Sequence, residues 1–495
     1  MRIAALGLVA AIAGCNQIWG NDPVSRWDAP QGEGPPEAAL PTARLELLVA
    51  TTTTSGAATN MVELRAISPA PTVQIGRVDG ALTPATYDNG AISIPADFPG
   101  TLWRLVYTLA GDVPRELHWS PADGEGRAVV PQFGGVDRGA VPANASYSLT
   151  PTNAPAGYSD LRVYTTGVWG VGQPSASGST ATQPMNPTEM KVFTGSLLAP
   201  DPAKGDRVVL VNYAGTYPCQ AAIGGAVFQI ELTGPSSMPT AAPPYVAVGT
   251  GVTVTGDTIQ AHARLAALFG VPSGQVLALV MFGYGASTAM PGFVAHPFNA
   301  PTWGPALIPL VRCLRDVTST DAFVLPPMDA AVLPRVAHAQ LFVLQGLPSG
   351  AATYSGLSGV VAATAPTQDV FTVDLPAGMP TNIKLGTTNL LDAHRVTLAG
   401  SSPTLDLTFE LDNGMHDYAT ATLYRANTST LVREREYTFT GTKLTIDRGV
   451  LSPQTEYVLE LRTYLGAPGA AAGDFTRYTG AQSSATRFTR TFVTP

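Results

Sequence analysis

Short runs rich in Val, Ile, Thr, Tyr and Phe recur along the chain, and clusters of Gly, Pro, Asn and Asp separate them. This pattern is typical of β-strands joined by tight turns in sandwiches and barrels. With 50 Gly and 43 Pro among 495 residues, a coiled coil or a long helical array is excluded, because Pro interrupts helices. The sequence therefore predicts a mainly β fold. The clearest predicted strands span residues 43–50, 61–67, 101–109, 160–166, 190–198, 207–213, 226–233, 275–282, 340–344 and 369–375.

Three local signals refine this prediction. The Asn-Gly steps within Asp88-Asn89-Gly90 and Asp412-Asn413-Gly414 favour hairpin turns, because these residues accept positive φ angles. Residues 258–269 predict one short helix, which Asp257 or Thr258 would cap and Gly270 would end. The apolar face of this helix is predicted to hold Ile259, Ala263, Leu265, Leu268 and Phe269.

The N-terminus reads MRIAALGLVAAIAGC, with Arg2 before an apolar run over residues 3–13. That run is shorter than the roughly 17–25 residues of a membrane-spanning helix. It is typical of a secretory signal peptide. Its ending, Ile12-Ala13-Gly14-Cys15, resembles the bacterial lipobox. The resemblance implies cleavage after residue 14 and lipidation of the Cys15 sulfur. A plain secretory signal with an incidental cysteine is the alternative.

The lipobox resemblance also implies a location. Two or more acyl chains on Cys15 would hold the protein stably on a membrane, and Asn16, in place of Asp, implies the outer membrane of the cell envelope. The start Cys15-Asn16-Gln17-Ile18-Trp19-Gly20 is similar to that of many myxobacterial lipoproteins. Residues 15–42 are rich in Pro, Gly and acid, and they predict a flexible tether of about 30 Å.

Charge limits the classes of partner. The whole chain carries a net charge of −8, and removal of residues 1–14 with Arg2 leaves 27 basic against 36 acidic residues. An acidic protein of this kind is not expected to bind nucleic acid. The predicted partner is the membrane, through the acyl chains, together with an unidentified protein or glycan.

The mature chain is long enough for roughly three domains. We expect several tandem antiparallel β-sandwich modules of the immunoglobulin/fibronectin type with one short helix. The predicted units are a β-sandwich over 43–150, a β-rich region of one or two modules over 151–398, and a last module over 399–495.

Two cysteines remain once Cys15 is lipidated. In an oxidising compartment Cys219 and Cys313 are expected to pair. Two buried thiols are an alternative. An activated Cys313 thiolate is another, because Arg312 and Arg315 flank it.

Residues 445–462 (TIDRGVLSPQTEYVLELR) resemble the corner between strands E and F of a fibronectin type III module. The resemblance implies that the Tyr457 hydroxyl turns back to the corner backbone, that Leu451 enters the core and that Pro453 stiffens the turn. Residues 404–411 would form an inner strand with 418–425 as its hairpin neighbour, and 487–493 would be the closing strand. Phe409 stands where the family usually has Trp.

No motif predicts catalysis. The histidines do not form a His-Glu-x-x-His frame, and Ser358 lacks the Gly-x-Ser-x-Gly frame of a hydrolase. Asp412, Asn413 and Asp417 have too few acidic oxygens for calcium, and a hairpin is the preferred interpretation. We therefore expect no catalytic residue, metal or cofactor.

The leading hypothesis is a lipid-anchored cell-envelope protein with a non-enzymatic role in surface interaction or structure. One alternative is an envelope hydrolase with its site in residues 151–398. Another is a glycan-binding lipoprotein that would use aromatic rings. The candidate rings are Tyr164, Trp169, Tyr213, Tyr217, Tyr284 and Trp303.

Overall fold

The computed structural model describes most of the predicted β regions. The described residues are 43–52, 60–78, 80–94, 103–119, 128–136, 147–152, 161–165, 168–172, 183–185, 208–214, 219–222, 229–233, 252–255, 257–285, 307–318, 320–325, 335–349, 352–364, 377–427, 430–466, 469–470 and 481–495. The signal peptide, the tether and the predicted strands at 190–198 and 369–375 lie outside these residues.

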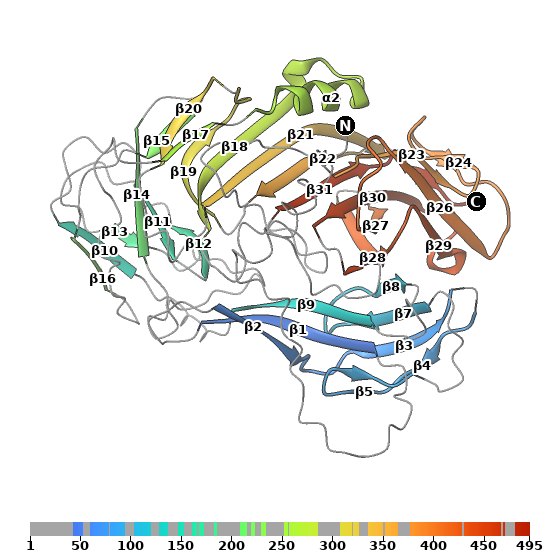
Figure 1. Cartoon of the computed structure of the whole chain (residues 1–495). Helices are drawn as coiled ribbons and strands as arrows, with labels where there is room; N and C mark the ends of the chain where they lie inside the picture. The colour runs from blue at the N-terminus through green and yellow to red at the C-terminus, as the bar shows by residue number, and fades with distance from the viewer. Residues whose placement is uncertain are drawn as a thin grey trace, which may run out of the picture.

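The fold is mainly β, as predicted, and its described part contains several sheets and one α-helix (Figure 1). Among the described residues, no helix has both the length and the apolar character that a membrane crossing requires.

The N-terminal strands form two facing sheets that enclose one core. The first sheet holds β1 (Ala43–Thr52), β2 (Asn60–Ala66), β5 (Tyr87–Asp88), β6 (Ala91–Ile92) and β9 (Ala128–Val136). The strands β3 (Thr72–Arg77), β4 (Thr83–Pro84), β7 (Trp103–Thr108) and β8 (Arg115–Trp119) continue into the largest sheet. Leu45 of β1 packs with Trp103, Leu105 and Leu117 because alternate side chains of β7 and β8 point to this core. The predicted turn between β5 and β6 is confirmed, since Asn89 and Gly90 both have positive φ.

The central strands form an antiparallel sheet with one helix packed on it (Figure 1). Its main strands are β18 (Val276–Gly285), β19 (Leu307–Cys313), β21 (Arg335–Ser349) and β22 (Ala352–Thr364). Beyond β19 the sheet continues through β15 (Cys219–Ala222), β14 (Val208–Ala214), β11 (Leu161–Thr165) and β12 (Val168–Gly172). Two small sheets accompany it, one of β10 (Tyr147–Thr152), β13 (Gln183–Met185) and β16 (Gln229–Thr233), the other of β17 (Val252–Thr255) and β20 (Ala322–Leu325).

The predicted helix is α2 (Ile259–Phe269), which Thr258 precedes and Gly270 ends in the left-handed conformation. A 3₁₀ turn, η4 (Ser273–Gln275), follows it. Leu265 and Ala266 are buried against β18 and β21, with Leu268 and Phe269 beside them. The predicted apolar face is wrong for Ile259 and Ala263, which are exposed, because the sheet contacts a face centred on Leu265 and Ala266.

The C-terminal strands form a second two-sheet sandwich. One sheet has the order β24 (Thr388–Asn389), β23 (Pro380–Leu385), β26 (Thr404–Leu411) and β29 (Lys443–Asp447). The facing strands are β28 (Leu431–Phe439), β27 (Tyr418–Ala426), β30 (Glu456–Leu465) and β31 (Ala481–Phe488), with β25 (Val396–Thr397) and β32 (Phe492–Val493) pairing at one end. Phe409, Leu459 and Leu461 lie in the core shared by the two sheets. Strand β23 joins this sandwich although it precedes residue 399.

The predicted hairpin between residues 404–411 and 418–425 is wrong. Strand β26 pairs with β23 and β29, whereas β27 pairs with β28 and β30 in the facing sheet. The connection therefore crosses from one sheet to the other. The Asp412 carboxylate accepts hydrogen bonds from the Met379 N–H and from Arg264 of α2, which fix the start of this connection.

The corner before β30 has the geometry that the sequence resemblance implies. After the 3₁₀ turn η5 (Arg448–Val450), Leu451 enters the core, and the Ser452 N–H donates a 2.9 Å hydrogen bond to the Tyr457 hydroxyl. Pro453 precedes Gln454, which has a φ of 51°. The hydrogen bond between Ser452 and Tyr457 ties the turn to the start of β30.

One pairing joins the two sandwiches into a continuous sheet. Strand β8 lies beside β28 (Figure 1) and pairs with it in parallel. In this register Glu116 lies beside Tyr437 and Leu117 beside Thr438. Neighbouring residues in such a register share a face. Leu117 belongs to the N-terminal core and Tyr437 to the C-terminal core, so the two cores lie on opposite faces of one sheet. At the other edge β31 pairs with β22, and the central strands join the same sheet across the predicted boundary at residue 398.

We predict that Tyr457→Phe lowers the free energy of unfolding by about 1 kcal/mol, because the Ser452 N–H loses its acceptor. Tyr437→Phe is the matched control. The Tyr437 hydroxyl lies in the same core and has no hydrogen-bond partner among the described residues, so its removal should be neutral or stabilising. Urea unfolding of both variants measures the difference, and equal losses would contradict the prediction.

Candidate functional site

The densest group of buried charges lies where β8 meets β28. We call it the junction cluster. On the face of the N-terminal core it contains Asp112, Arg115, Arg433, Glu436, Glu460 and Arg462. On the opposite face it contains Arg104, Glu116, His118 and Arg435.

Strand alternation places these side chains. Arg115 and Leu117 point to one face of β8, whereas Glu116 and His118 point to the other. In β28, the pairing with β27 shifts by one residue, and Glu434 is the extra residue of this bulge. The bulge brings Arg433 and Glu436, three positions apart, to the same face.

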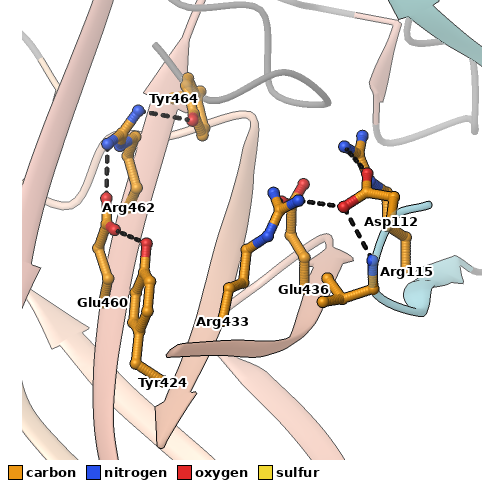
Figure 2. Close-up of polar contacts among 9 residues, drawn as sticks. Asp112, Arg115, Tyr424, Arg433, Glu436, Glu460, Arg462 and Tyr464 are labelled. Atoms are coloured by element: carbon orange, nitrogen blue, oxygen red, sulfur yellow. Dashed lines mark hydrogen bonds and ion pairs between the residues drawn. The ribbon is translucent and has the colours of Figure 1, made fainter. Parts of the chain in front are cut away.

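Asp112 is the central acceptor on the first face (Figure 2). It accepts hydrogen bonds from the Val113 N–H at 2.8 Å and from Arg115 at 2.7 Å, and it pairs with Arg433 of β28. Burial raises the pKa of Asp112, but the Arg115 and Arg433 guanidinium groups and the Val113 N–H outweigh it, so the pKa lies below its usual value. Asp112 thus links the loop before β8 to β28 as a carboxylate.

Glu436 lies beside Asp112 and Arg433, but its carboxylate has fewer hydrogen bonds than that of Asp112. Its Oε2 accepts a 3.3 Å hydrogen bond from Arg433, and its buried Oε1 has no hydrogen-bond partner among the described residues. Burial raises the pKa of Glu436. Arg115 and Arg433 oppose this increase only in part, and Asp112 and Glu460 add to it. The carboxylate is therefore the weakly compensated charge of the cluster.

The same face of β30 carries a short chain of polar contacts (Figure 2). Glu460 accepts hydrogen bonds from Arg462 at 2.5 Å and from the Tyr424 hydroxyl at 2.8 Å, and Arg462 reaches the Tyr464 hydroxyl at 3.5 Å. The Tyr464 ring stacks on Tyr418 with centroids 4.6 Å apart, and both rings pack into the N-terminal core. These residues attach the outer face of the C-terminal sandwich to the N-terminal one.

On the opposite face Glu116 holds three partners. Its Oε1 lies 2.5 Å from Nε of Arg104 and 2.6 Å from Nε2 of His118, and its Oε2 lies 2.9 Å from Arg435 of β28. Burial raises the pKa of Glu116, but the His118 and Arg104 contacts outweigh it and lower the pKa to about 2. Glu116 is therefore ionised at neutral pH and pairs across the junction.

Both faces of the cluster are closed to large ligands, since its carboxylates and the Arg104, Arg115 and His118 side chains are largely buried. Buried ion pairs contribute little net stability, but removal of one partner is costly. The arrangement is thus suited to fixing the register between the two sandwiches.

Two of the predicted site residues meet in the central sheet. Cys219 of β15 and Cys313 of β19 lie opposite each other and form a disulfide. The bond joins the short strand β15 to the buried core beneath α2. Cys15 lies outside the described residues.

The described histidines do not gather at one place. His262 lies 2.6 Å from Asp316, His394 Nε2 lies 2.7 Å from Arg490, and His416 Nε2 lies 3.0 Å from the Gly441 carbonyl oxygen. His338 of β21 is fully buried, and neither ring nitrogen has a hydrogen-bond partner among the described residues. His296 lies outside these residues. No group of three or more His, Cys, Asp or Glu side chains within the described ranges could hold a metal ion.

The polar candidates Ser358, Asn413 and Asp417 make hydrogen bonds within the fold. Ser358 is buried in β22, where its hydroxyl donates to Gln345 and accepts from the Phe488 N–H. In the 412–417 loop, Asn413 accepts from the Met415 N–H and Asp417 from the Gly466 N–H. Of the aromatic glycan candidates, Tyr217 and Trp303 lie outside the described residues, and for Tyr164, Trp169, Tyr213 and Tyr284 only the strand is described.

The junction cluster was missed from sequence. The available signal was the run Arg433-Glu434-Arg435-Glu436 inside a strand-like segment. Charges in a strand usually mark a solvated edge. Here that edge is covered by β8, which the sequence places more than 300 residues earlier.

Comparison with known proteins adds little. No family model and no curated protein matches the chain. Among solved structures, Salmonella alpha-2-macroglobulin reacted with methylamine aligns over 88% of this chain at 10% identity and a TM-score of 0.13, and the alignment covers 28% of that protein. A TM-score this low supports no inference about fold or activity.

We predict that reduction of the Cys219–Cys313 bond lowers the free energy of unfolding by up to about 4–5 kcal/mol, because the bond closes a loop of 94 residues. Urea unfolding with and without reductant measures the loss. A double Cys219→Ala, Cys313→Ala variant should be as unstable as the reduced protein and insensitive to reductant. An effect of reductant on that variant would contradict the prediction.

A second prediction concerns His338. Burial lowers its pKa to about 3, whereas an unfolded histidine has a pKa of about 6.5. Between these values the unfolded chain binds one more proton than the folded chain, so stability decreases as pH falls, by at most about 1.4 kcal/mol per unit. Unfolding measured from pH 7 to 5 should show a shallower decrease for His338→Leu. The control His416→Gln replaces a partly exposed imidazole, and an equal change there would reject the assignment.

Proposed function

We propose that this chain is a lipid-anchored protein of the bacterial cell envelope, placed in the outer membrane, with a non-enzymatic role in structure or surface interaction. The observation that carries the proposal is Ile12-Ala13-Gly14-Cys15 at the end of a short apolar segment. Diacylglycerol on the Cys15 sulfur and an amide-linked acyl chain on its amino group would form the anchor.

Two structural features support export and a mechanical role. The Cys219–Cys313 disulfide suits an oxidising compartment, because disulfides rarely persist in the cytosol. The continuous sheet and the junction cluster tie the first and last sandwiches together, so the folded part is suited to act as a rigid body carried on the 15–42 tether. A rigid body held off a membrane is suited to present a surface or to act as a spacer.

We predict that Cys15→Ala releases the protein from the membrane into the soluble fraction, because the thiol that accepts the lipid is lost. Fractionation and mass spectrometry of the N-terminal peptide measure the two effects. The wild-type peptide should begin at Cys15 and carry acyl mass. Membrane retention of the variant, together with an unmodified wild-type peptide, would overturn the proposal.

The variant Asn16→Asp provides the matched test of location. It leaves Cys15 intact, so acylation should persist while the protein moves from the outer to the inner membrane fraction. An acylated wild-type protein found in the inner membrane would retain the anchor but reject the outer-membrane assignment.

A further inference from the structure

Glu436 combines three conditions at a contact between two sandwiches. It is almost fully buried, its Oε1 has no hydrogen-bond partner in the described part of the chain, and two further carboxylates share its face. The main chain at Glu436 is itself part of the contact, because its N–H donates to the Pro114 carbonyl just before β8. A change in the charge of Glu436 therefore acts directly on the β8–β28 pairing.

Charged or titratable groups face Glu436 from five places. Arg433 comes from β28 itself, Arg115 from β8, and Asp112 from the loop before β8. Glu460 and its partner Arg462 come from β30. Tyr424 of β27 donates to Glu460, and Thr422 is the uncharged residue beside Glu436 in that strand. Three arginines thus meet three carboxylates on this face.

We propose that Glu436 makes the junction between the two sandwiches a proton-sensitive clamp, which holds β8 against β28 more tightly as the surrounding pH falls. Proton uptake removes a buried charge and its repulsion from Asp112 and Glu460. The arginines do not lose their anchor, because Arg433 and Arg115 both remain paired with Asp112. A protonated carboxyl also becomes a hydrogen-bond donor inside the cluster.

The direction of the pH effect follows from the linkage between proton binding and folding. The folded pKa of Glu436 is raised, so its contribution to stability is complete below the unfolded pKa and is lost as pH rises through the folded pKa. Asp112 and Glu116 have lowered pKa values and contribute in the opposite sense, with stability lost as pH falls. The clamp is independent of the lipid anchor, since it uses only folded residues.

Hydrogen exchange of the purified full chain between pH 8 and 5 tests the clamp. Exchange rates are divided by the intrinsic rate at each pH, and protection is compared between peptides from β8 and β28 and peptides from β26 and β29, two strands that contain no histidine. The ratio of protection at the junction to protection in β26 and β29 should rise on acidification, by at most about tenfold per pH unit for one proton.

Two variants test whether Glu436 causes the pH dependence of the protection ratio. Glu436→Gln should show a ratio that is high at pH 8 and nearly independent of pH, because its side chain carries no charge. Glu434→Gln is the matched control on the same strand. Glu434 is partly exposed and pairs with Arg425 at 2.5 Å, so this variant should retain the wild-type profile.

The wild-type ratio decides the proposal even if Glu436→Gln fails to fold. A ratio that stays flat or falls between pH 8 and 5 would overturn the clamp. So would a Glu436→Gln profile that matches the wild type, or a Glu434→Gln variant that alone abolishes the pH response.

Discussion

The parallel pairing of β8 with β28 is the contact on which the rest of the architecture depends. It joins segments that are far apart in the sequence, since Arg433 of β28 pairs with Asp112, 321 positions earlier in the loop before β8. It also makes two sandwiches share one sheet. Because β8 and β28 pair with each other, neither sandwich keeps a free strand edge at this point. The two cores lie on opposite faces of the shared sheet. The outer face of the C-terminal sandwich is consequently buried, and polar residues that would be solvated in an isolated module lie inside the protein.

This burial explains the contrast between the two carboxylates of the junction. Glu116 has guanidinium or imidazole partners on both oxygens and stays ionised, whereas Glu436 has one long hydrogen bond and two carboxylates nearby. The difference comes from the local count of donors, since both side chains are buried to a similar extent. A buried carboxylate stays charged when its hydrogen bonds are complete, and it becomes sensitive to pH when they are not.

Features that depend on neighbouring residues could be predicted from the sequence. The end of α2 at Gly270, the Asn89-Gly90 turn and the inward-facing Leu459 and Leu461 follow from C-capping, positive φ and strand alternation. The hairpin at 412–414 was wrong because a turn signal does not reveal whether the next strand returns to the same sheet. The β8–β28 pairing could not be predicted, because nothing in either strand identifies a partner so distant in sequence. For the same reason, Arg433 and Glu436 would have been read as solvated.

The distance between β8 and β28 along the chain also constrains the order of assembly. During synthesis and export, β8 emerges long before its partner, and closing so large a loop has a considerable entropic cost. Until β28 (residues 431–439) is present, the N-terminal sandwich has an open strand edge that other chains could pair with. A chain truncated before residue 431 would therefore be prone to aggregation, and a chaperone that shields β8 during transit would serve this protein better than one that shields its apolar core.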